Sequence, residues 1–182
     1  MTFPVSDHAA YYERLFFNHN QEDLPMENKT TIQTVKGTIF DTGRAEGVAV
    51  FIPAGLVGIR LDAERFASSF GVMTDLHPKE MVVCSLPEPV SGITRHLVFF
   101  DNLKKKIETI EDMRRQVEDT LDALSALGAK TVAMNGIRSY TLPDRTSRQE
   151  TYQRRFVEDY VEKHPGVFET IWLVDKRGGF DK

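Results

Sequence analysis

The sequence predicts an α/β protein in which helices cover a mixed, largely parallel sheet on both faces. The first observation is the order of patterns in the C-terminal half, where helix, strand, helix and strand follow one another between residues 110 and 174. Strands that alternate with long helices are typical of sheets with parallel neighbours and two covered faces. The second observation is the length of 182 residues, which suffices for one domain with a substantial core.

The composition excludes several other classes of protein. Hydrophobic residues make up 41% and charged residues 27% of the chain, a balance found in globular and not in disordered proteins. Cys84 is the single cysteine, which excludes a disulfide framework and a thiolate zinc site within the chain. A net charge of −4 argues against broad nucleic-acid binding. The chain shows neither an apolar run of about 20 residues nor a secretory signal, so we expect a cytoplasmic protein without a membrane partner.

Residues 1–30 are expected to form an extension outside the α/β domain, which we place at residues 31–182. Within the extension, residues 6–17 carry aromatic and aliphatic side chains at helical spacing. The polar stretch over residues 18–29 contains Pro25 and is typical of a linker.

Six segments favour β-strands because they are short, apolar and rich in β-branched or aromatic residues. They are residues 32–40, 47–52, 81–84, 94–100, 130–134 and 168–174. The second of them is apolar throughout and is stopped by Pro53, which suits a strand buried on both faces. Residues 87–92 contain two prolines, a serine and a glycine, and are expected to form a turn-rich connection between the third and fourth strands.

Three segments favour helices: residues 62–70, 110–127 and 147–163. In the second, apolar side chains recur at steps of three and four. Thr109 and Asp112 form a capping-box pattern at its start, and Gly128 is expected to end it. In the third, Ser147 is a capping residue and Pro165 stops the helix.

Two loops that directly follow predicted strands are the candidate ligand site, because ligands of open α/β sheets bind beyond the carboxyl ends of the strands. Residues 53–58 contain Gly55 and Gly58, which let a ligand approach the backbone closely. Residues 135–143 offer backbone N–H groups, hydroxyls and a guanidinium, which suit phosphate or carboxylate. From this second loop we select Asn135, Gly136, Ile137, Arg138, Ser139 and Tyr140. The alternative is that both loops only connect elements.

The common catalytic motifs are absent from the sequence, which contains no G-x-S-x-G elbow, phosphate-binding P-loop or dinucleotide fingerprint. The five histidines lack metal-ligand spacing, so we expect no metal and no cofactor. His96 lies in a predicted strand and is the one histidine of interest, while Cys84 is interpreted as an inert buried thiol. Asp41, Asp62 and Asp144 are candidate general bases, but no nucleophile or metal pairs with them in the pattern. The sequence therefore favours a protein that is not an enzyme.

The order of elements and several local strings resemble the macro domain family, an ADP-ribose-binding fold. Residues 32–39 are similar to the family's first strand, which ends in Gly-Asp-Ile-Thr, and residues 47–54 to the strand that ends in Asn-Ala-Ala-Asn. Residues 127–137 are similar to the helix-to-strand passage before the family's phosphate-cradling loop. The likeness covers residues 32 to 174 and implies a three-layer α/β/α macro-like fold.

The same resemblance implies a changed ligand site. Thr38 stands where the family has an aspartate that accepts from the adenine amino group. Phe51 and Ala54 stand where the family has two asparagines, the second of which orients the distal ribose in hydrolases. We add Thr38 and Ala54 to the ligand-lining residues. We expect a divergent macro-like protein that binds a nucleotide-type or other anionic small molecule, with Tyr140 stacked on a base or ribose, and that lacks ADP-ribosyl hydrolase activity.

The alternative hypothesis is a protein-interaction module in which the fold persists and the pocket is filled by Phe51 and Tyr140. Residues 3–17 are rich in aromatic side chains, namely Phe3, Tyr11, Tyr12, Phe16 and Phe17. Aromatic residues are enriched at the cores of protein interfaces, so this segment would form a homodimer contact. The simpler interpretation is a helix packed on the edge of the sheet.

Overall fold

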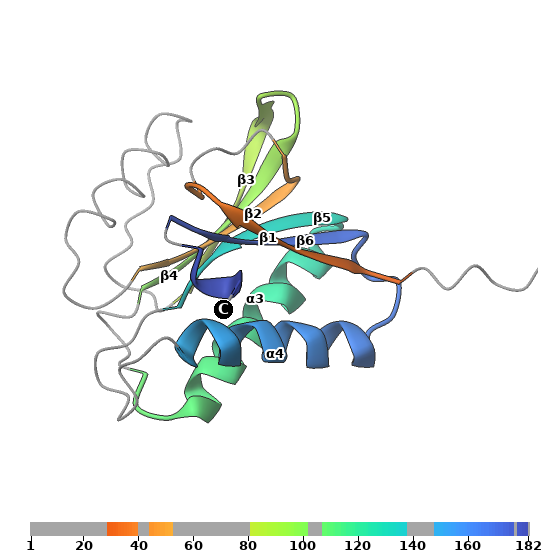
Figure 1. The fold of residues 1–182 in the computed structure, drawn as a ribbon. Helices are drawn as coiled ribbons and strands as arrows, with labels where there is room; N and C mark the ends of the chain where they lie inside the picture. Colours follow the sequence, from red (N-terminus) through yellow and green to blue (C-terminus); the bar gives the residue numbers. More distant parts are fainter. Residues whose placement is uncertain are drawn as a thin grey trace, which may run out of the picture.

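Six strands and two long helices make up the part of the chain that the computed structural model describes (Figure 1). The described residues are 29–39, 44–52, 81–101, 107–137, 148–176 and 178–181. The strands are β1 (Thr31–Lys36), β2 (Gly47–Ile52), β3 (Met81–Val90), β4 (Thr94–Asp101), β5 (Thr131–Asn135) and β6 (Thr170–Asp175). The helices are α3 (Ile110–Ala126) and α4 (Arg148–Lys163), followed near the C-terminus by the 3-10 turn η1 (Gly179–Asp181). The helices expected over residues 6–17 and 62–70 lie outside the described residues.

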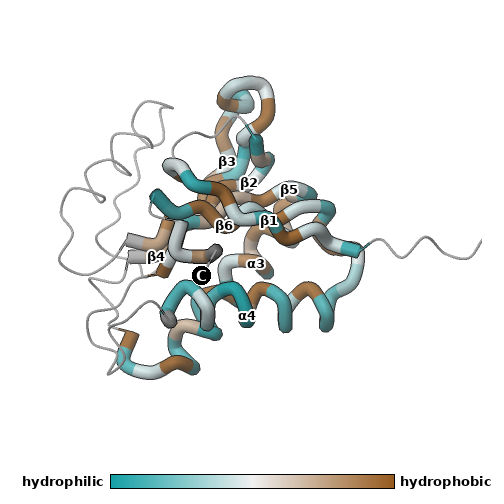
Figure 2. The backbone as a smooth tube through the Cα atoms, in the orientation of Figure 1, coloured by the Kyte–Doolittle hydropathy of each residue, from teal (hydrophilic) through white to brown (hydrophobic). Residues whose placement is uncertain are grey.

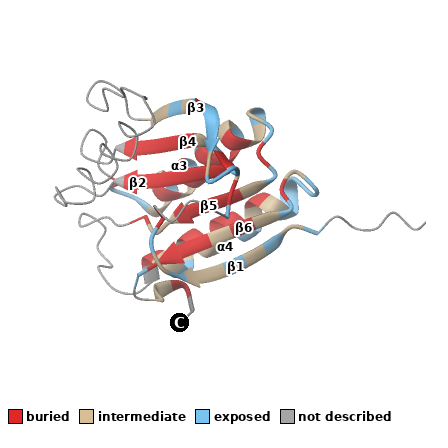
Figure 3. Cartoon of the chain, turned by 90° about the horizontal axis from the view of Figure 1, so that it is seen from above, coloured by how far each residue is buried: buried red, intermediate tan, exposed pale blue. Residues whose placement is uncertain are grey.

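The strands form one mixed sheet in the order β1-β6-β5-β2-β4-β3. Every neighbouring pair is parallel except β3 and β4, which are antiparallel. The mixed, largely parallel sheet predicted from the sequence is therefore confirmed. Figure 3 shows that the strands inside the sheet are mostly buried, whereas β1 and β3 at its two edges are more exposed. This gradient matches the sequence, in which the segment of β2 is apolar throughout.

The strand β3 is longer than the sequence predicts. It runs through the two prolines to Val90, and its register against β4 shifts between Ser85 and Val90. The turn is confined to the three following residues, where Ser91 and Gly92 have φ values of 52° and 72°. Because β3 is the last strand of the described sheet, one side of its backbone needs no partner strand, and prolines are tolerated at such an edge.

The start and end of α3 follow from local chemistry. The Thr109 hydroxyl accepts from the Asp112 N–H at 3.1 Å, and the Asp112 carboxylate accepts from the Thr109 N–H at 2.9 Å. The predicted capping box is therefore confirmed. The hydrogen bond from the Thr109 side chain is the main cause that lowers the pKa of Asp112. Gly128 follows the helix with a φ of 79°, a left-handed conformation that glycine adopts without strain.

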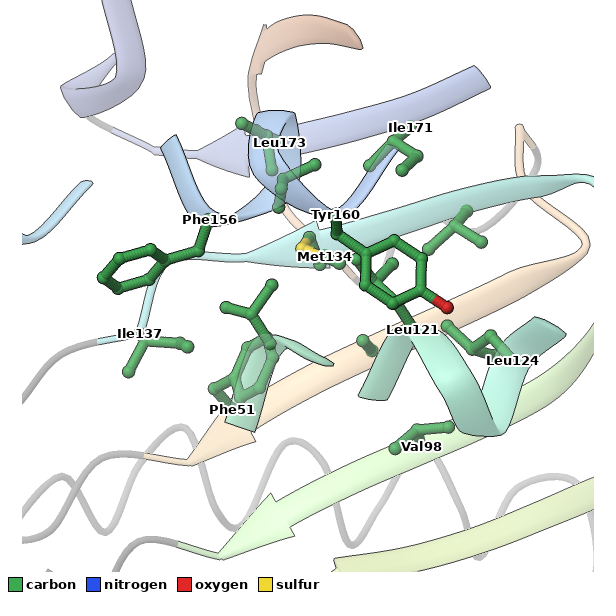
Figure 4. Packing of buried hydrophobic residues seen from close by; sticks show 14 of the residues in the cluster. Phe51, Val98, Leu121, Leu124, Met134, Ile137, Phe156, Tyr160, Ile171 and Leu173 are labelled. Atoms are coloured by element: carbon green, nitrogen blue, oxygen red, sulfur yellow. The ribbon is translucent and has the colours of Figure 1, made fainter. Parts of the chain in front are cut away.

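The main core lies between the sheet and the two helices, which cover the same face (Figure 1). Figure 4 shows Phe51, Met134 and Leu173 from three strands gathered with Leu121 of α3 and Phe156 of α4. Figure 2 shows apolar and polar residues alternating along α4, as an amphipathic helix requires. No helix among the described residues is long and apolar enough to cross a membrane.

The opposite face of the sheet carries a second apolar cluster. Val48, Val50, Leu97 and Phe99 point to this face from β2 and β4, and each is at most 1% exposed. They alternate along their strands with residues of the main core, as the period of two in a strand dictates. The sheet is therefore buried on both faces at its centre.

Candidate functional site at the carboxyl edge of the sheet

The carboxyl ends of five strands meet at one edge of the sheet because β1, β6, β5, β2 and β4 are mutually parallel. In Figure 3 the arrows of β2, β4 and β6 point to this edge. Polar residues stand where four of these strands end: Thr38 just beyond β1, Asp175 at the end of β6, Asn135 at the end of β5 and Asp101 at the end of β4. Ligands of open α/β sheets bind at such an edge, so its geometry decides what this fold can hold.

The strands β2 and β5 part at this edge, and the side chain of Asn135 bridges them. Their regular pairing ends with Ala49 opposite Met134. Beyond that point the Asn135 Oδ1 atom accepts from the Phe51 N–H at 2.7 Å, and its Nδ2 atom donates to the Phe51 C=O at 2.9 Å. One amide side chain thus binds both backbone groups of Phe51, which a neighbouring strand would otherwise do. The two strands stay connected although their ladder has stopped.

A second amide fixes the chain that follows β5. Gln153 of α4 is fully buried; its Oε1 atom accepts from the Ile137 N–H at 2.6 Å, and its Nε2 atom donates to the Asn135 C=O at 2.9 Å. We call Asn135, Gln153 and the backbone groups that they bind on Phe51 and Ile137 the amide clamp. It ties β2, the first residues of the loop after β5, and α4 together, and each amide donates and accepts once within it.

The C-terminal turn η1 is joined by hydrogen bonds to the end of β6 and to α4. The Gly179 N–H donates to the Asp175 carboxylate at 2.7 Å, and the Arg154 guanidinium donates to the Phe180 C=O at 3.3 Å. The Phe180 side chain is buried in the main core. A Cβ atom placed on Gly136 would lie 3.7 Å from the Phe180 ring, an ordinary contact. Steric space therefore does not demand glycine at position 136.

Four of the ten predicted ligand-lining residues are described by the structure, and they have different surroundings. Thr38 is exposed, Gly136 is half-buried, and Asn135 uses its amide on Phe51. Ile137 was expected to line the site, but its side chain is fully buried in the main core and its N–H is bound by Gln153. Thr38 follows β1 and Asn135 ends β5, two strands that are separated by β6. Ala54, Gly55, Gly58, Arg138, Ser139 and Tyr140 lie outside the described residues.

Two residues near the site are placed by the core. The Phe51 side chain lies in the main core and is 1% exposed (Figure 4). Gln153 was not selected at all. Its signal was a pair of glutamines, Gln149 and Gln153, four residues apart on a helix whose same face carries Phe156 and Val157. Buried polar groups are nearly always hydrogen-bonded, so amide side chains on a buried helix face indicate that they bind nearby backbone groups.

His96 and Cys84, the histidine and the cysteine singled out in the sequence, lie in β4 and β3. His96 Nδ1 lies 2.8 Å from the Ser85 hydroxyl across β4 and β3. His96 lies opposite Gly47, at the end of the sheet away from the amide clamp. Burial, assisted by the positive charge of Arg95, lowers the pKa of His96. Burial raises the pKa of Cys84 to about 11, as expected of an inert thiol. The described ranges contain no cluster of histidine, cysteine and acidic residues that would hold a metal.

No protein-family model and no curated protein matches the chain. Solved structures do match it. The macrodomain of Trypanosoma brucei aligns with a TM-score of 0.63 at 11% identity, over 82% of this chain and 65% of that one. The chain has the macrodomain fold. The complex of the T. brucei macrodomain with ADP-ribose gives a TM-score of 0.62 at 12% identity, over 82% of this chain and 67% of that one. The macrodomain of Mycobacterium tuberculosis DarG gives 0.54 at 15% identity, over 79% of this chain and 97% of that one.

The macrodomain fold confirms the predicted three-layer α/β/α class and the family resemblance at the level of the fold. The chain spans slightly less than two thirds of the length of the trypanosomal macrodomain. At such low sequence identities, the structural alignment shows that the backbones follow a similar course. It does not transfer the roles of the site residues from one protein to the other. The amide clamp is a feature of this chain, and the division at residue 30 stays a prediction.

Proposed function

We propose that this macrodomain-fold protein binds a nucleotide-type or other phosphate-bearing small molecule at the carboxyl edge of its sheet, between the ends of β2 and β5, without ADP-ribosyl hydrolase activity. The fold supports this class of ligand, because the trypanosomal macrodomain with a similar fold has been solved with ADP-ribose. The proposed edge is also the one at which open α/β sheets bind ligands.

The amide clamp is the observation that carries the proposal. A loop that receives phosphate must hold its backbone in place before the ligand arrives, because ordering it on binding would cost affinity. The clamp holds Asn135 and Ile137 through two buried or half-buried amides. The clamp already binds the Ile137 N–H, so this N–H is not available to a phosphate. The donors to phosphate are therefore expected in the residues that follow Ile137. The guanidinium of Arg138 and the hydroxyl of Ser139 are the donors that we propose.

The exposed Thr38 supports weak discrimination for adenine. It stands just beyond β1, where an aspartate would offer a charged acceptor to the adenine amino group. A hydrogen bond to a neutral group contributes about 0.5–1.5 kcal/mol, whereas one to a charged group contributes about 1.5–3 kcal/mol. We therefore expect the phosphates rather than the base to dominate recognition. The absence of hydrolase activity rests on Ala54, an apolar residue that cannot orient a ribose by hydrogen bonding.

Isothermal titration with ADP-ribose, ADP, ribose 5-phosphate and inorganic phosphate tests the proposal. The wild-type chain should bind at least one phosphate ester, and Arg138→Ala should weaken that binding about tenfold or more. Arg155→Ala is the matched control, because Arg155 is an exposed arginine on α4. Equal affinities of wild type and Arg138→Ala would contradict the proposed donor. Release of ADP-ribose from a mono-ADP-ribosylated protein at a rate above background would contradict the absence of hydrolase activity.

The alternative of a homodimerisation module predicts a different outcome. The whole panel of phosphate esters would then give no heat, and light scattering of the full chain would give twice the monomer mass at micromolar concentration. A monomer mass together with saturable ligand binding would exclude this alternative.

A further inference from the structure

The ligand site at the carboxyl edge continues into a small hollow beside the end of β1. Gly37 and Thr38, the two residues that follow β1, line this hollow, and Thr38 is one of the predicted ligand-lining residues. The volume of the hollow is about 80 Å³. Only β6 separates β1 from β5, the strand that leads to Arg138. The hollow is therefore a part of the same site, two strands away from the loop that follows β5.

Apolar side chains form the floor of the hollow, and Trp172 forms part of its wall. The floor consists of Val35, Ala133 and Val174, which belong to the second apolar cluster or pack against it. The indole N–H of Trp172 donates to the Gln33 Oε1 atom at 3.0 Å. The polar edge of the indole is therefore already bound before any ligand arrives, and floor and wall together form a surface of low polarity.

The charged residues that line the hollow are both cations. They are Lys36 at the end of β1 and Arg44, which precedes β2. Both residues are exposed, and neither forms an ion pair with another residue of the described ranges. The carboxylate of Asp175, which lies opposite Lys36 in the register of β6 and β1, instead accepts from the Gly179 N–H at 2.7 Å. A cleft that is lined by one sign of charge and has walls of low polarity concentrates groups of the opposite charge. The hollow is therefore suited to an anion.

We propose that the ligand of the carboxyl edge carries two separate phosphate groups, one at Arg138 and Ser139 and the other in the hollow, facing Arg44 and Lys36. This inference rests on the function proposed above and narrows its ligands from phosphate esters in general to bisphosphates. The volume limits what enters, because about 80 Å³ equals two or three water molecules in the liquid. That size suits the terminal oxygens of a phosphate group and excludes a purine. Thr38 in the lining carries no charge that would repel the phosphate.

The spacing of the strands sets the distance between the two phosphates. Neighbouring strands lie about 4.8 Å apart, so the ends of β1 and β5, on either side of β6, lie about 10 Å apart. A sugar that is phosphorylated at both ends spans a distance of this order. The two phosphorus atoms of pyrophosphate share one bridging oxygen and are much closer together. We therefore expect a sugar bisphosphate to use both positions and pyrophosphate to use only one.

Isothermal titration at low salt with fructose 6-phosphate and fructose 1,6-bisphosphate tests the inference. The quantity of interest is the ratio of their two dissociation constants. The bisphosphate should bind the wild type about tenfold more tightly than the monophosphate. Arg44→Gln should reduce this advantage about threefold to fivefold, as loss of one exposed cation predicts, and should leave the monophosphate affinity unchanged. Arg155→Gln removes the same charge from an exposed position of α4, on the other side of the sheet, and should leave the ratio unchanged.

The outcomes separate a failure of this inference from a failure of the proposed function. If the monophosphate binds, Arg138→Ala weakens it, and the bisphosphate binds no more tightly, the function stands and the second phosphate position is refuted. An advantage of the bisphosphate that is equal in wild type and Arg44→Gln would also refute the position in the hollow. An equal advantage of pyrophosphate over inorganic phosphate would show that charge and not spacing is recognised. If no phosphate ester binds, both proposals are refuted.

Discussion

The replacement Gln153→Leu tests the amide clamp most directly. Gln153 is fully buried and makes two hydrogen bonds, to the Ile137 N–H and to the Asn135 C=O. Leucine has a similar volume and neither a donor nor an acceptor, so the replacement leaves two backbone groups without their partner. Each buried polar group that loses its partner costs about 1–3 kcal/mol, so the free energy of unfolding should fall by about 2–6 kcal/mol.

The isosteric replacement Gln153→Glu adds a dependence on pH. The introduced carboxyl still accepts from the Ile137 N–H, but when ionised it cannot donate to the Asn135 C=O. Its pKa in the folded state is therefore raised above the unfolded value of about 4.3. Below a pH of about 4 the introduced carboxyl is protonated, and the variant keeps its full free energy of unfolding relative to wild type. This free energy is lost as the pH rises through the pKa of the carboxyl in the folded state. Each unit of that rise corresponds to about 1.4 kcal/mol.

Urea unfolding, followed by circular dichroism at pH 4 and pH 7, measures both effects. Thr151→Leu is the matched control, because Thr151 is an exposed residue of α4 and its replacement should change the stability by less than about 0.5 kcal/mol. A loss below about 0.5 kcal/mol for Gln153→Leu would refute the energetic role of the clamp. A Gln153→Glu variant with the same stability relative to wild type at both pH values would refute the hydrogen-bond assignment.

Three further predictions follow from single contacts. Thr38→Asp should strengthen ADP-ribose binding about tenfold in isothermal titration, because it introduces a charged acceptor at the end of β1. Gly47→Ala should destabilise the protein by about 1–3 kcal/mol in urea unfolding, because its Cβ atom would lie 2.7 Å from Leu124 Cδ2. Thr109→Ala should cost about 1 kcal/mol at pH 7. Since the Thr109 side chain lowers the pKa of Asp112, this difference should shrink as the pH falls through that lowered pKa.

Each of these predictions has a matched control. Thr38→Asn has a similar shape without the charge, and an equal gain from it would show that charge is not the cause. Gly136→Ala should cost less than Gly47→Ala, because its Cβ atom would make only an ordinary contact at 3.7 Å. Equal losses for the two glycine variants would contradict the steric argument. A Thr109→Ala difference that grew on acidification would contradict the lowered pKa of Asp112.

The parts of the fold that local chemistry controls were predictable from the sequence. The capping box of Thr109 and Asp112 and the glycine that ends α3 are confirmed because their partners lie within a few residues. The strand β2 was predictable because its apolar run is stopped by a proline. The extent of β3 was not, because its prolines are tolerated only by virtue of its place at the edge of the sheet.

The candidate site divides in the same way. The sequence alone determined that a loop after a parallel strand near Asn135 is the place to search, because strand and helix alternate there. Only the tertiary structure decided that Asn135 binds the backbone of Phe51, which lies 84 residues away in the chain. It also decided that Ile137 belongs to the core and that Gln153 fixes the loop. Hydrogen bonds between distant segments exist only after the strands have paired, so no local pattern encodes them.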